Sequence, residues 1–289
     1  MPSARYPLRR ELVTLRDQQQ IYLHWYRFSP TASSPPTPRA VTLLLHGVTG
    51  NTYDHYELAE RLAGAGILAV GFDRRGHGGL RLQRPRFNTT GDQEDLKEVI
   101  DIVRGRHSSL PLFAVGYSAG SSLLGRYLGE QGDDSHIDGA VLVSPGFDME
   151  EAILMGHLHP LADYYLTQVA KNLFLEGLGT DVPLSKRQDL AVRRLKSSRS
   201  MREFHAELHP FSGHESAEEY FKANNPAPLL KDIARPTLFI NSHDDMMFPK
   251  ELIRQWTWLA DANENIAMVQ TRWGGHCCFY EGPLSLQPV

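Results

Sequence analysis

The sequence predicts an α/β fold built on a mostly parallel central sheet, and three observations lead to this prediction. Short apolar runs alternate with amphipathic stretches from about residue 40 to residue 145, as in strand–helix–strand units with parallel strands. The alternation resumes at Pro236, after a polar and helix-rich interruption. A Gly-x-Ser-x-Gly pentapeptide at residues 116–120 joins an apolar run to a helix-forming stretch, which favours a sharp strand-to-helix turn.

Composition limits the class of protein. The 289 residues are 41% hydrophobic, which is ample for the core of one large domain. The net charge is −4 and no long basic block occurs, so we expect a small-molecule partner and no nucleic acid. The two cysteines, Cys277 and Cys278, are adjacent and give no disulfide framework. No stretch approaches the ~20 apolar residues of a membrane span, and residues 1–5 lack the apolar core of a signal peptide. We expect a cytoplasmic protein without an integral membrane segment, and the oligomeric state stays open.

The first elements should form one edge of the sheet. Residues 11–15 and 20–27 are rich in β-forming residues on either side of a short polar turn, which predicts an antiparallel hairpin. The segment 29–39 is rich in Pro, Ser and Thr and should be irregular. The apolar run 40–45 predicts a strand buried on both faces. A helix over 55–65 and a strand over 67–72 would complete the first parallel unit.

The next units contain the pentapeptide. Thr90 and Gln93 resemble a capping box, and the helix that follows has one apolar face, formed by Leu96, Val99, Ile100 and Val103. Residues 111–115 predict the strand before the turn, and Leu123, Leu124, Tyr127 and Leu128 recur with helical spacing after it. Residues 139–145 predict a further buried strand.

The polar interruption predicts an insertion into the fold. Residues 147–230 are mostly helix-forming, and Leu166, Val169 and Leu173 mark one amphipathic helix. We expect residues 1–146 and 231–289 to form the core, with 147–230 as a helical cap over the carboxyl ends of the strands. After the insertion we predict a strand over 236–241, a helix over 249–260 and a last strand over 266–270.

Ser118 is the candidate nucleophile, because the turn places its hydroxyl clear of the backbone. Gly116 and Gly120 are needed because a Cβ at either position would collide with the neighbouring strand or helix. A serine hydroxyl is a poor nucleophile at neutral pH, so a histidine must accept its proton and a carboxylate must orient that histidine.

In this topology the acid and then the histidine follow the serine along the chain. Of the 13 histidines, the base is expected after the Pro236 strand, where His276 lies in the loop Trp273-Gly274-Gly275-His276. The acid should follow the same strand, where Asp244 and Asp245 are neighbours. Side chains of consecutive extended residues point in opposite directions, so one of the two would face His276 and the other would be solvated or hold the loop.

A tetrahedral oxyanion formed at Ser118 needs preorganised donors, and the backbone N–H groups of Val48 and Ala119 are the candidates. His46 and His77 are expected to be structural, hydrogen-bonded histidines. The Cys and His residues lack zinc-site spacing, and the glycine-rich loop 46–50 lacks the lysine of a phosphate-binding loop. We therefore expect no metal and no cofactor.

Seven short motifs together resemble the α/β-hydrolase superfamily and, within it, the YheT-like branch that includes the animal ABHD1, ABHD2 and ABHD3 proteins. They are His46–Gly50, Asp73–Gly76, Gly116–Gly120, Tyr127–Glu130, Arg202–Phe204, Asn241–Asp245 and Gly274–His276. In related hydrolases the acid lies nine residues after the strand-opening proline and four before a second one. The distances from Pro236 and Pro249 therefore favour Asp245. The chain departs from the family pattern at Ala119, His205, His214 and Phe221, mostly within the insertion, where substrate choice would be affected.

The resemblance implies a serine hydrolase of the carboxylesterase or lipase kind, which cleaves carboxylic esters, with acylglycerol-like lipids among the candidates, through an acyl-enzyme on Ser118. The insertion has more apolar residues than one short helix needs for packing, and some should line an acyl or alcohol pocket. We therefore expect uncharged esters with short to medium acyl chains as substrates. Those apolar residues are Ile153, Leu154, Met155, Leu166, Leu173 and Phe174. Two other functions stay open: a cofactor-free acyltransferase that uses the same residues, and a non-catalytic binding module.

Overall fold

The computed structural model describes residues 8–26, 37–154, 158–281 and 287–288, and all structural statements below concern those residues. Three sequence-based expectations fall wholly or partly elsewhere. The structure does not describe residues 1–5, which were expected to lack a signal-peptide core. It also leaves out most of the segment 29–39, which was expected to be irregular, and the expected pocket residue Met155.

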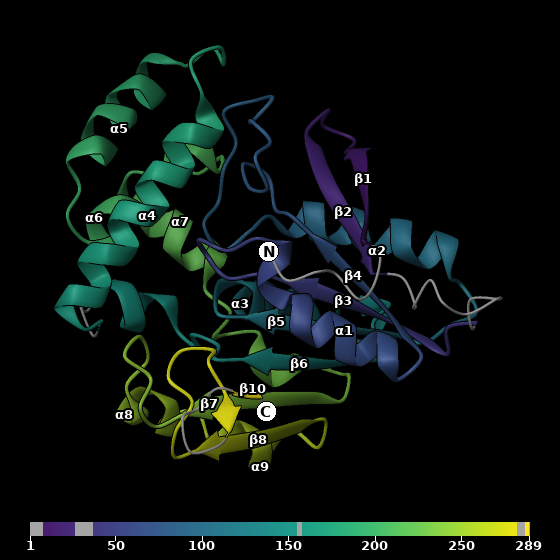
Figure 1. Ribbon diagram of the computed structural model, residues 1–289. Coiled ribbons are helices and arrows are strands. Elements are labelled where there is room, and N and C mark those ends of the chain that lie inside the picture. The colour runs from purple at the N-terminus through teal and green to yellow at the C-terminus, as the bar shows by residue number, and fades with distance from the viewer. Residues whose placement is uncertain (1–7, 27–36, 155–157, 282–286, 289) are drawn as a thin grey trace.

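Eight strands form one sheet in the order β1-β2-β4-β3-β5-β6-β7-β8 (Figure 1). The strands β3 to β8 pair in parallel, which confirms the predicted mostly parallel sheet. A separate two-stranded ribbon joins β9 (Tyr280–Glu281) and β10 (Gln287–Pro288). The parallel strands are β3 (Ala40–Leu45), β4 (Ile67–Phe72), β5 (Leu112–Tyr117), β6 (Gly139–Val143), β7 (Thr237–Ser242) and β8 (Ile266–Thr271).

The predicted hairpin forms the antiparallel edge of the sheet. Strand β1 (Leu8–Thr14) pairs with β2 (Gln20–Tyr26), and β2 pairs in turn with β4. The side chains of β2 are mostly buried, because this strand lies between β1 and β4 within the sheet. The polar turn between the two strands contacts the long loop between β4 and α2 (Gln93–Arg106).

Helices cover both faces of the sheet. Helix α1 (Tyr56–Gly64), preceded by the short helix η1 (Thr52–His55), packs on one face through Ala59. The opposite face is covered by α2 (Gln93–Arg106), α3 (Ala119–Gln131), α8 (Lys250–Arg254) and α9 (Trp258–Ala262), which share the main apolar core with the strands. Strands β3 and β4 are therefore almost fully buried between helices, as the apolar runs predicted, whereas β5 and β8 keep exposed positions.

Two details of these helices differ from the sequence-based expectation. The N-cap of α2 is Asp92, whose side chain accepts from the N–H of Glu94, so the predicted capping box of Thr90 and Gln93 is wrong. Asp92 is two residues closer to the helix than Thr90, and its carboxylate is the stronger acceptor. The helix predicted over 249–260 is two short helices, because the chain leaves helical pairing between α8 and α9.

The segment between β6 and β7 builds a second apolar cluster of its own. It contains the π-helical turn η3 (Glu150–Leu154), α4 (Pro160–Leu178), α5 (Lys186–Ser197), α6 (Met201–Ala206), η4 (His209–Phe211), α7 (Ala217–Asn224) and η5 (Leu230–Asp232). Figure 1 shows α4 to α7 gathered beyond one end of the sheet. Their aromatic side chains, including Phe174, Phe204 and Phe211, pack against one another away from the main core.

The face that α4 buries is not the predicted one. Ala170, Phe174 and Leu178 are fully buried in the second cluster, whereas Leu166 and Leu173 are only half-buried. Periodicity alone placed the apolar stripe about one residue out of phase, since both sets repeat with helical spacing. Leu166 instead lines the two cavities that also contain Ser118 in their walls.

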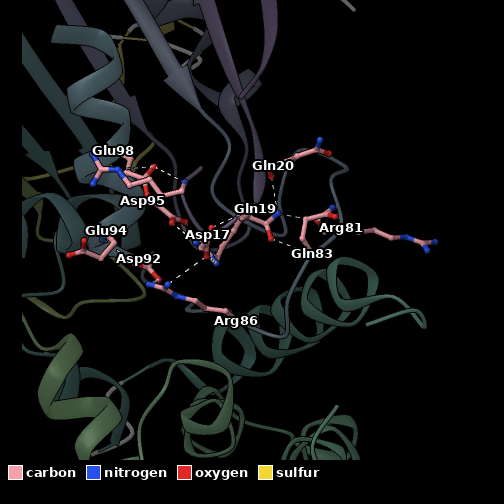
Figure 2. Close-up of polar contacts among 12 residues, drawn as sticks. Asp17, Gln19, Gln20, Arg81, Gln83, Arg86, Asp92, Glu94, Asp95 and Glu98 are labelled. Atoms are coloured by element: carbon pink, nitrogen blue, oxygen red, sulfur yellow. Dashed lines mark hydrogen bonds and ion pairs between the residues drawn. The ribbon is translucent and has the colours of Figure 1, made fainter. Parts of the chain in front are cut away.

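The loop of residues 73–92, between β4 and α2, is held by the turn of the β1–β2 hairpin (Figure 2). The N–H of Gln83 donates to Oε1 of Gln19 over 2.9 Å. Arg86 forms ion pairs with Asp17 at 3.6 Å and with Asp92 at 2.5 Å. This network fixes a loop that has little secondary structure of its own and that reaches from the core to the helices α6 and α7.

Within the described residues, every helix is too short or too polar to cross a membrane.

Candidate active site

Ser118 occupies the turn between β5 and α3 in a strained backbone conformation. Its φ is +51° and its ψ is −118°, a region that residues other than glycine seldom adopt. The conformation is held because the Ser118 N–H donates to the carbonyl of Val143 over 2.9 Å, and its carbonyl accepts from Ser121 and Ser122. The turn therefore presents the Ser118 hydroxyl at the carboxyl edge of the sheet.

The two glycines of the pentapeptide are required by close backbone contacts. A Cβ on Gly116 would lie 2.6 Å from the carbonyl oxygen of Gly120, and a Cβ on Gly120 would lie 2.5 Å from that of Leu45. Both distances are shorter than any real Cβ contact, so β5, α3 and β3 approach closely only with glycine at these positions.

His276 and Asp245 lie next to the Ser118 hydroxyl. Nε2 of His276 is 2.7 Å from Oγ of Ser118, and Nδ1 of His276 is 2.9 Å from Oδ2 of Asp245. A carboxylate accepts only, so Nδ1 carries the proton and donates to Asp245, while Nε2 accepts the hydroxyl proton. The structure thus brings together the three side chains that the sequence singled out, from β5, β7 and β8 and the loops that follow them.

The two neighbouring aspartates have different surroundings. The Asp245 side chain is fully buried, and its Oδ1 accepts from the N–H groups of Met247 and Phe248, which leaves Oδ2 for His276. Asp244 is exposed and its Oδ1 accepts from the N–H of Gly275 over 2.9 Å. One aspartate therefore orients the imidazole, and the other holds the loop on which His276 lies.

The backbone groups named as oxyanion donors lie beside Ser118. Ala119 is the first residue of α3, so its N–H has no acceptor within the helix. Val48 follows Gly47, where a Cβ would lie 3.5 Å from Cβ of Ser118. Val48, Ser118 and Ala119 line one cavity together.

Buried polar side chains form hydrogen bonds that fix the loop 46–50. Nδ1 of His46 donates to the carbonyl of Gly47 over 2.8 Å, and Nε2 accepts from the backbone N–H of Arg74 over 3.1 Å. Nε2 of His77 is 3.1 Å from the carbonyl of Val48. His46 and His77 are thus hydrogen-bonded structural histidines, as expected.

The sequence reasoning missed Arg74, Thr89, His205 and Tyr220 as neighbours of the site. The guanidinium of Arg74 donates to the carbonyls of Gly47 and Thr89, and Oγ1 of Thr89 lies 2.8 Å from His205 and 3.0 Å from Tyr220. The signals available in the sequence were the Asp73–Gly76 motif and the unusual His205, but neither indicates burial or a partner. This network joins α6 and α7 to the loop 46–50.

Burial keeps the histidines around the site neutral. Loss of hydration lowers the pKa of His55, of His77 and of His205 to about 4 each. It also lowers the pKa of His46 well below its usual range, with the charge of Arg74 adding to the effect. Among the described His, Cys, Asp and Glu residues, no group of three or more could hold a metal ion.

Acid should therefore weaken the fold. The pKa of His55, His77 and His205 lies near 4 in the folded protein and near 6.5 in the unfolded chain, so the unfolded chain takes up protons first as the pH falls. The free energy of unfolding should be highest above pH 6.5 and fall between pH 6.5 and 4, by on the order of 3 kcal/mol for each histidine. Urea unfolding at pH 7, 5.5 and 4.5 measures this. The variant His205→Asn should show a smaller decrease, and a free energy independent of pH over this range would contradict the expectation.

Two cavities meet at Ser118. A narrow one of about 60 Å³ extends under the segment between β6 and β7, and it is lined mainly by apolar side chains that include Met149, Ile153, Leu158 and Leu166. A wide one of about 920 Å³ lies on the His276 side, with Asp54, Glu57 and Arg61 among its lining residues. Of the apolar residues expected to line a pocket, Ile153 and Leu166 do so, while Leu154, Leu173 and Phe174 pack in the second cluster.

Comparisons with known proteins agree with the fold and with the resemblance seen in the sequence. Residues 36–266 match the family described as Serine aminopeptidase, S33. The chain is 31% identical to Phospholipase ABHD3 of Homo sapiens, over 95% of this chain and 67% of that protein. It is 33% identical to Protein ABHD15 of Homo sapiens, over 94% of this chain and 58% of that protein. A soluble variant of the monoglyceride lipase from Saccharomyces cerevisiae, solved with a substrate analog, has the same fold, with a TM-score of 0.61 and 19% identity over 96% of this chain and 90% of that chain.

Proposed function

The chain belongs to the α/β-hydrolase superfamily, within the family described as Serine aminopeptidase, S33, and from this membership we propose that it hydrolyses carboxylic esters through an acyl-enzyme on Ser118. The observation that carries the proposal is the contact of Ser118 with His276 at 2.7 Å and of His276 with Asp245 at 2.9 Å. A serine, a histidine and a buried carboxylate in this arrangement are the parts that acyl transfer needs.

In the proposed reaction, Oγ of Ser118 attacks the ester carbonyl while Nε2 of His276 takes the hydroxyl proton. Asp245 stabilises the imidazolium that results. The negative charge on the carbonyl oxygen is stabilised by the N–H groups of Val48 and Ala119. His276 then gives its proton to the leaving alcohol, and a water molecule, activated by the same histidine, releases the acid and restores Ser118.

The narrow cavity is the proposed acyl site. Its lining residues are mostly apolar, and none of the described ones is an aspartate or glutamate that could bind the free amino group of a peptide substrate. We propose that residues 147–230 act as a cap, since Ile153, Leu158 and Leu166 of this segment form one wall of the cavity. Met149, Met201 and Met247 contribute flexible side chains, which can rearrange to admit a longer acyl chain.

The wide cavity is the proposed alcohol site. His276 lines this cavity, and the leaving oxygen must face the nitrogen that protonates it. Its volume of about 920 Å³ is far larger than that of the narrow cavity, and it continues from His276 over one face of the sheet, past Val115 and Val269. The two sides together favour a substrate with a short or medium acyl chain on a bulky alcohol.

A series of p-nitrophenyl esters from acetate to palmitate tests this proposal. Each added methylene should improve kcat/KM by up to about 0.8 kcal/mol until the narrow cavity is full, after which the gain should stop. The matching amides and phosphates should react far more slowly. Product analysis with added alcohols separates hydrolysis from acyl transfer.

Two variants connect the chain-length preference to the cavity. Ile153→Phe would fill the narrow cavity and should move the optimum to shorter acyl chains. Leu154→Phe changes the next residue, which packs in the second apolar cluster, and should leave the optimum in place. A flat dependence on chain length, or amides cleaved faster than esters, would contradict the proposed function.

A further inference from the structure

Arg74 is a buried cation that, within the described part of the chain, has no acidic partner. The residue is 2% exposed, and its side chain donates to two carbonyl oxygens, those of Thr89 at 2.6 Å and of Gly47. Its neighbour Arg75 is equally buried but forms ion pairs with Asp95 and Asp17. A buried charge without a counterion destabilises a fold, so stability does not explain why a cation lies here.

The carbonyl that Arg74 contacts belongs to the peptide group of a proposed oxyanion donor. The carbonyl of Gly47 and the N–H of Val48 form one trans peptide, and the two point in opposite directions. Arg74 and Nδ1 of His46 both donate to the Gly47 oxygen and fix it on the buried side. The Val48 N–H therefore points away from Arg74, and Val48 lines the cavity that it shares with Ser118 and Ala119.

On the basis of the ester hydrolysis proposed above, we propose that Arg74 is a positioning residue that orients and polarises the Gly47–Val48 peptide, so that the Val48 N–H becomes a fixed and strong donor to the oxyanion. A peptide whose carbonyl accepts from a cation is a better donor through its N–H, because hydrogen bonds in a chain polarise one another. The charge also acts over a short distance in a site of low dielectric, where it favours the negative charge that develops in the transition state.

The surroundings of Arg74 preserve this effect. His46, which contacts the same carbonyl, and His77, which contacts the carbonyl of Val48, are kept neutral by burial, so Arg74 is the fixed cation at this position. Burial lowers the pKa of Arg74 to about 9, which still leaves the guanidinium charged at neutral pH. Thr89 anchors the other end of the guanidinium and is itself tied to His205 and Tyr220.

The test compares Arg74→Met, which removes the charge at similar length, with Arg74→Lys, which keeps it. Complete loss of an oxyanion donor lowers kcat by about 10²–10³. Because the Val48 N–H is weakened and not removed, Arg74→Met should lower kcat for p-nitrophenyl acetate by about 10- to 100-fold with KM within about threefold of wild type. Arg74→Lys should recover most of the loss. A trifluoromethyl ketone, which forms an oxyanion on Ser118, should lose affinity by the same factor as kcat/KM, whereas a non-reacting ether analogue should bind as before.

Arg75→Met is the matched control, since it removes an equally buried arginine one residue away that has no contact with Gly47. It should lower the melting temperature and leave kcat per active site unchanged, with active sites counted by the end point of fluorophosphonate labelling. Where Arg74→Met does not fold, Arg74→Gln takes its place, because it can still donate to the Gly47 oxygen without a charge. A loss of about 10-fold in kcat is expected, at the lower end of the range for methionine, because glutamine keeps the contact and loses only the charge.

A folded Arg74→Met or Arg74→Gln variant with kcat within twofold of wild type would overturn the inference, and so would a loss confined to KM or a Lys variant as slow as the Met variant. Failure of the proposed function gives a different result. In that case the wild-type protein would hydrolyse no ester and Ser118 would not react with the fluorophosphonate.

Discussion

Replacing Ser118 by alanine is expected to lower kcat for ester hydrolysis by about 10³–10⁶, and replacing His276 by alanine should have an effect of similar size. The two side chains act as one unit, because the hydroxyl gives its proton to the nitrogen 2.7 Å away in the step that forms the new bond. The double variant should therefore be little worse than either single variant.

The measurement is kcat with p-nitrophenyl butyrate, together with fluorophosphonate labelling, which Ser118→Ala should abolish. Ser135→Ala is a suitable control, since this buried serine lies just beyond α3 and far from the turn in sequence. His243→Asn controls for His276, because His243 bonds to Gln270 at the same edge of the sheet. Wild-type turnover by Ser118→Ala would show that another residue is the nucleophile.

Asp245→Asn is expected to lower kcat by up to about 10⁴. In the variant, the amide oxygen can still accept from Met247 and Phe248, which turns the NH₂ group toward Nδ1 of His276. Nδ1 must then accept, so the imidazole proton moves to Nε2, where it blocks transfer from Ser118. The protein should fold normally and bind substrate with little change in KM.

The adjacent Asp244→Asn is the matched variant. It keeps an oxygen that can accept from the N–H of Gly275, so it should lower kcat by about tenfold at most. Both variants need the same assay and a thermal unfolding curve. The reverse ranking, with Asp244→Asn the slower enzyme, would assign the orienting role to Asp244.

Most of the fold could be predicted because its strands are continuous apolar runs. Residues 40–45 and 67–72 match β3 and β4 at both ends, since a parallel strand buried on both faces is a nearly continuous apolar run whose limits are clear. The ends and the buried faces of the helices were harder to predict. Asp92 replaced Thr90 as the cap of α2, and α4 buries Phe174 where periodicity favoured Leu173, because tertiary packing decides between stripes of similar hydrophobicity.

The site was predictable to the extent that chain order constrains it. Ser118 and His276 follow from a motif and from the order of elements, whereas the residues alone left Asp244 and Asp245 as alternatives and the family resemblance favoured Asp245. Arg74 lies in the Asp73–Gly76 motif, but the motif indicated neither its burial nor its partners. Its proposed role depends on contacts with Gly47 and Thr89, which are 27 and 15 residues away in sequence. A local sequence pattern does not predict contacts between residues so far apart.

The backbone of Ser118 also bears on how this fold could be made more robust. A residue with a Cβ at φ +51° and ψ −118° loses on the order of 1 kcal/mol of folding free energy relative to an unstrained one, and glycine avoids most of that penalty. Glycine at position 118 would therefore relieve the backbone strain and remove the nucleophile in a single substitution. At this one position, the proposed activity and the backbone stability therefore make opposite demands.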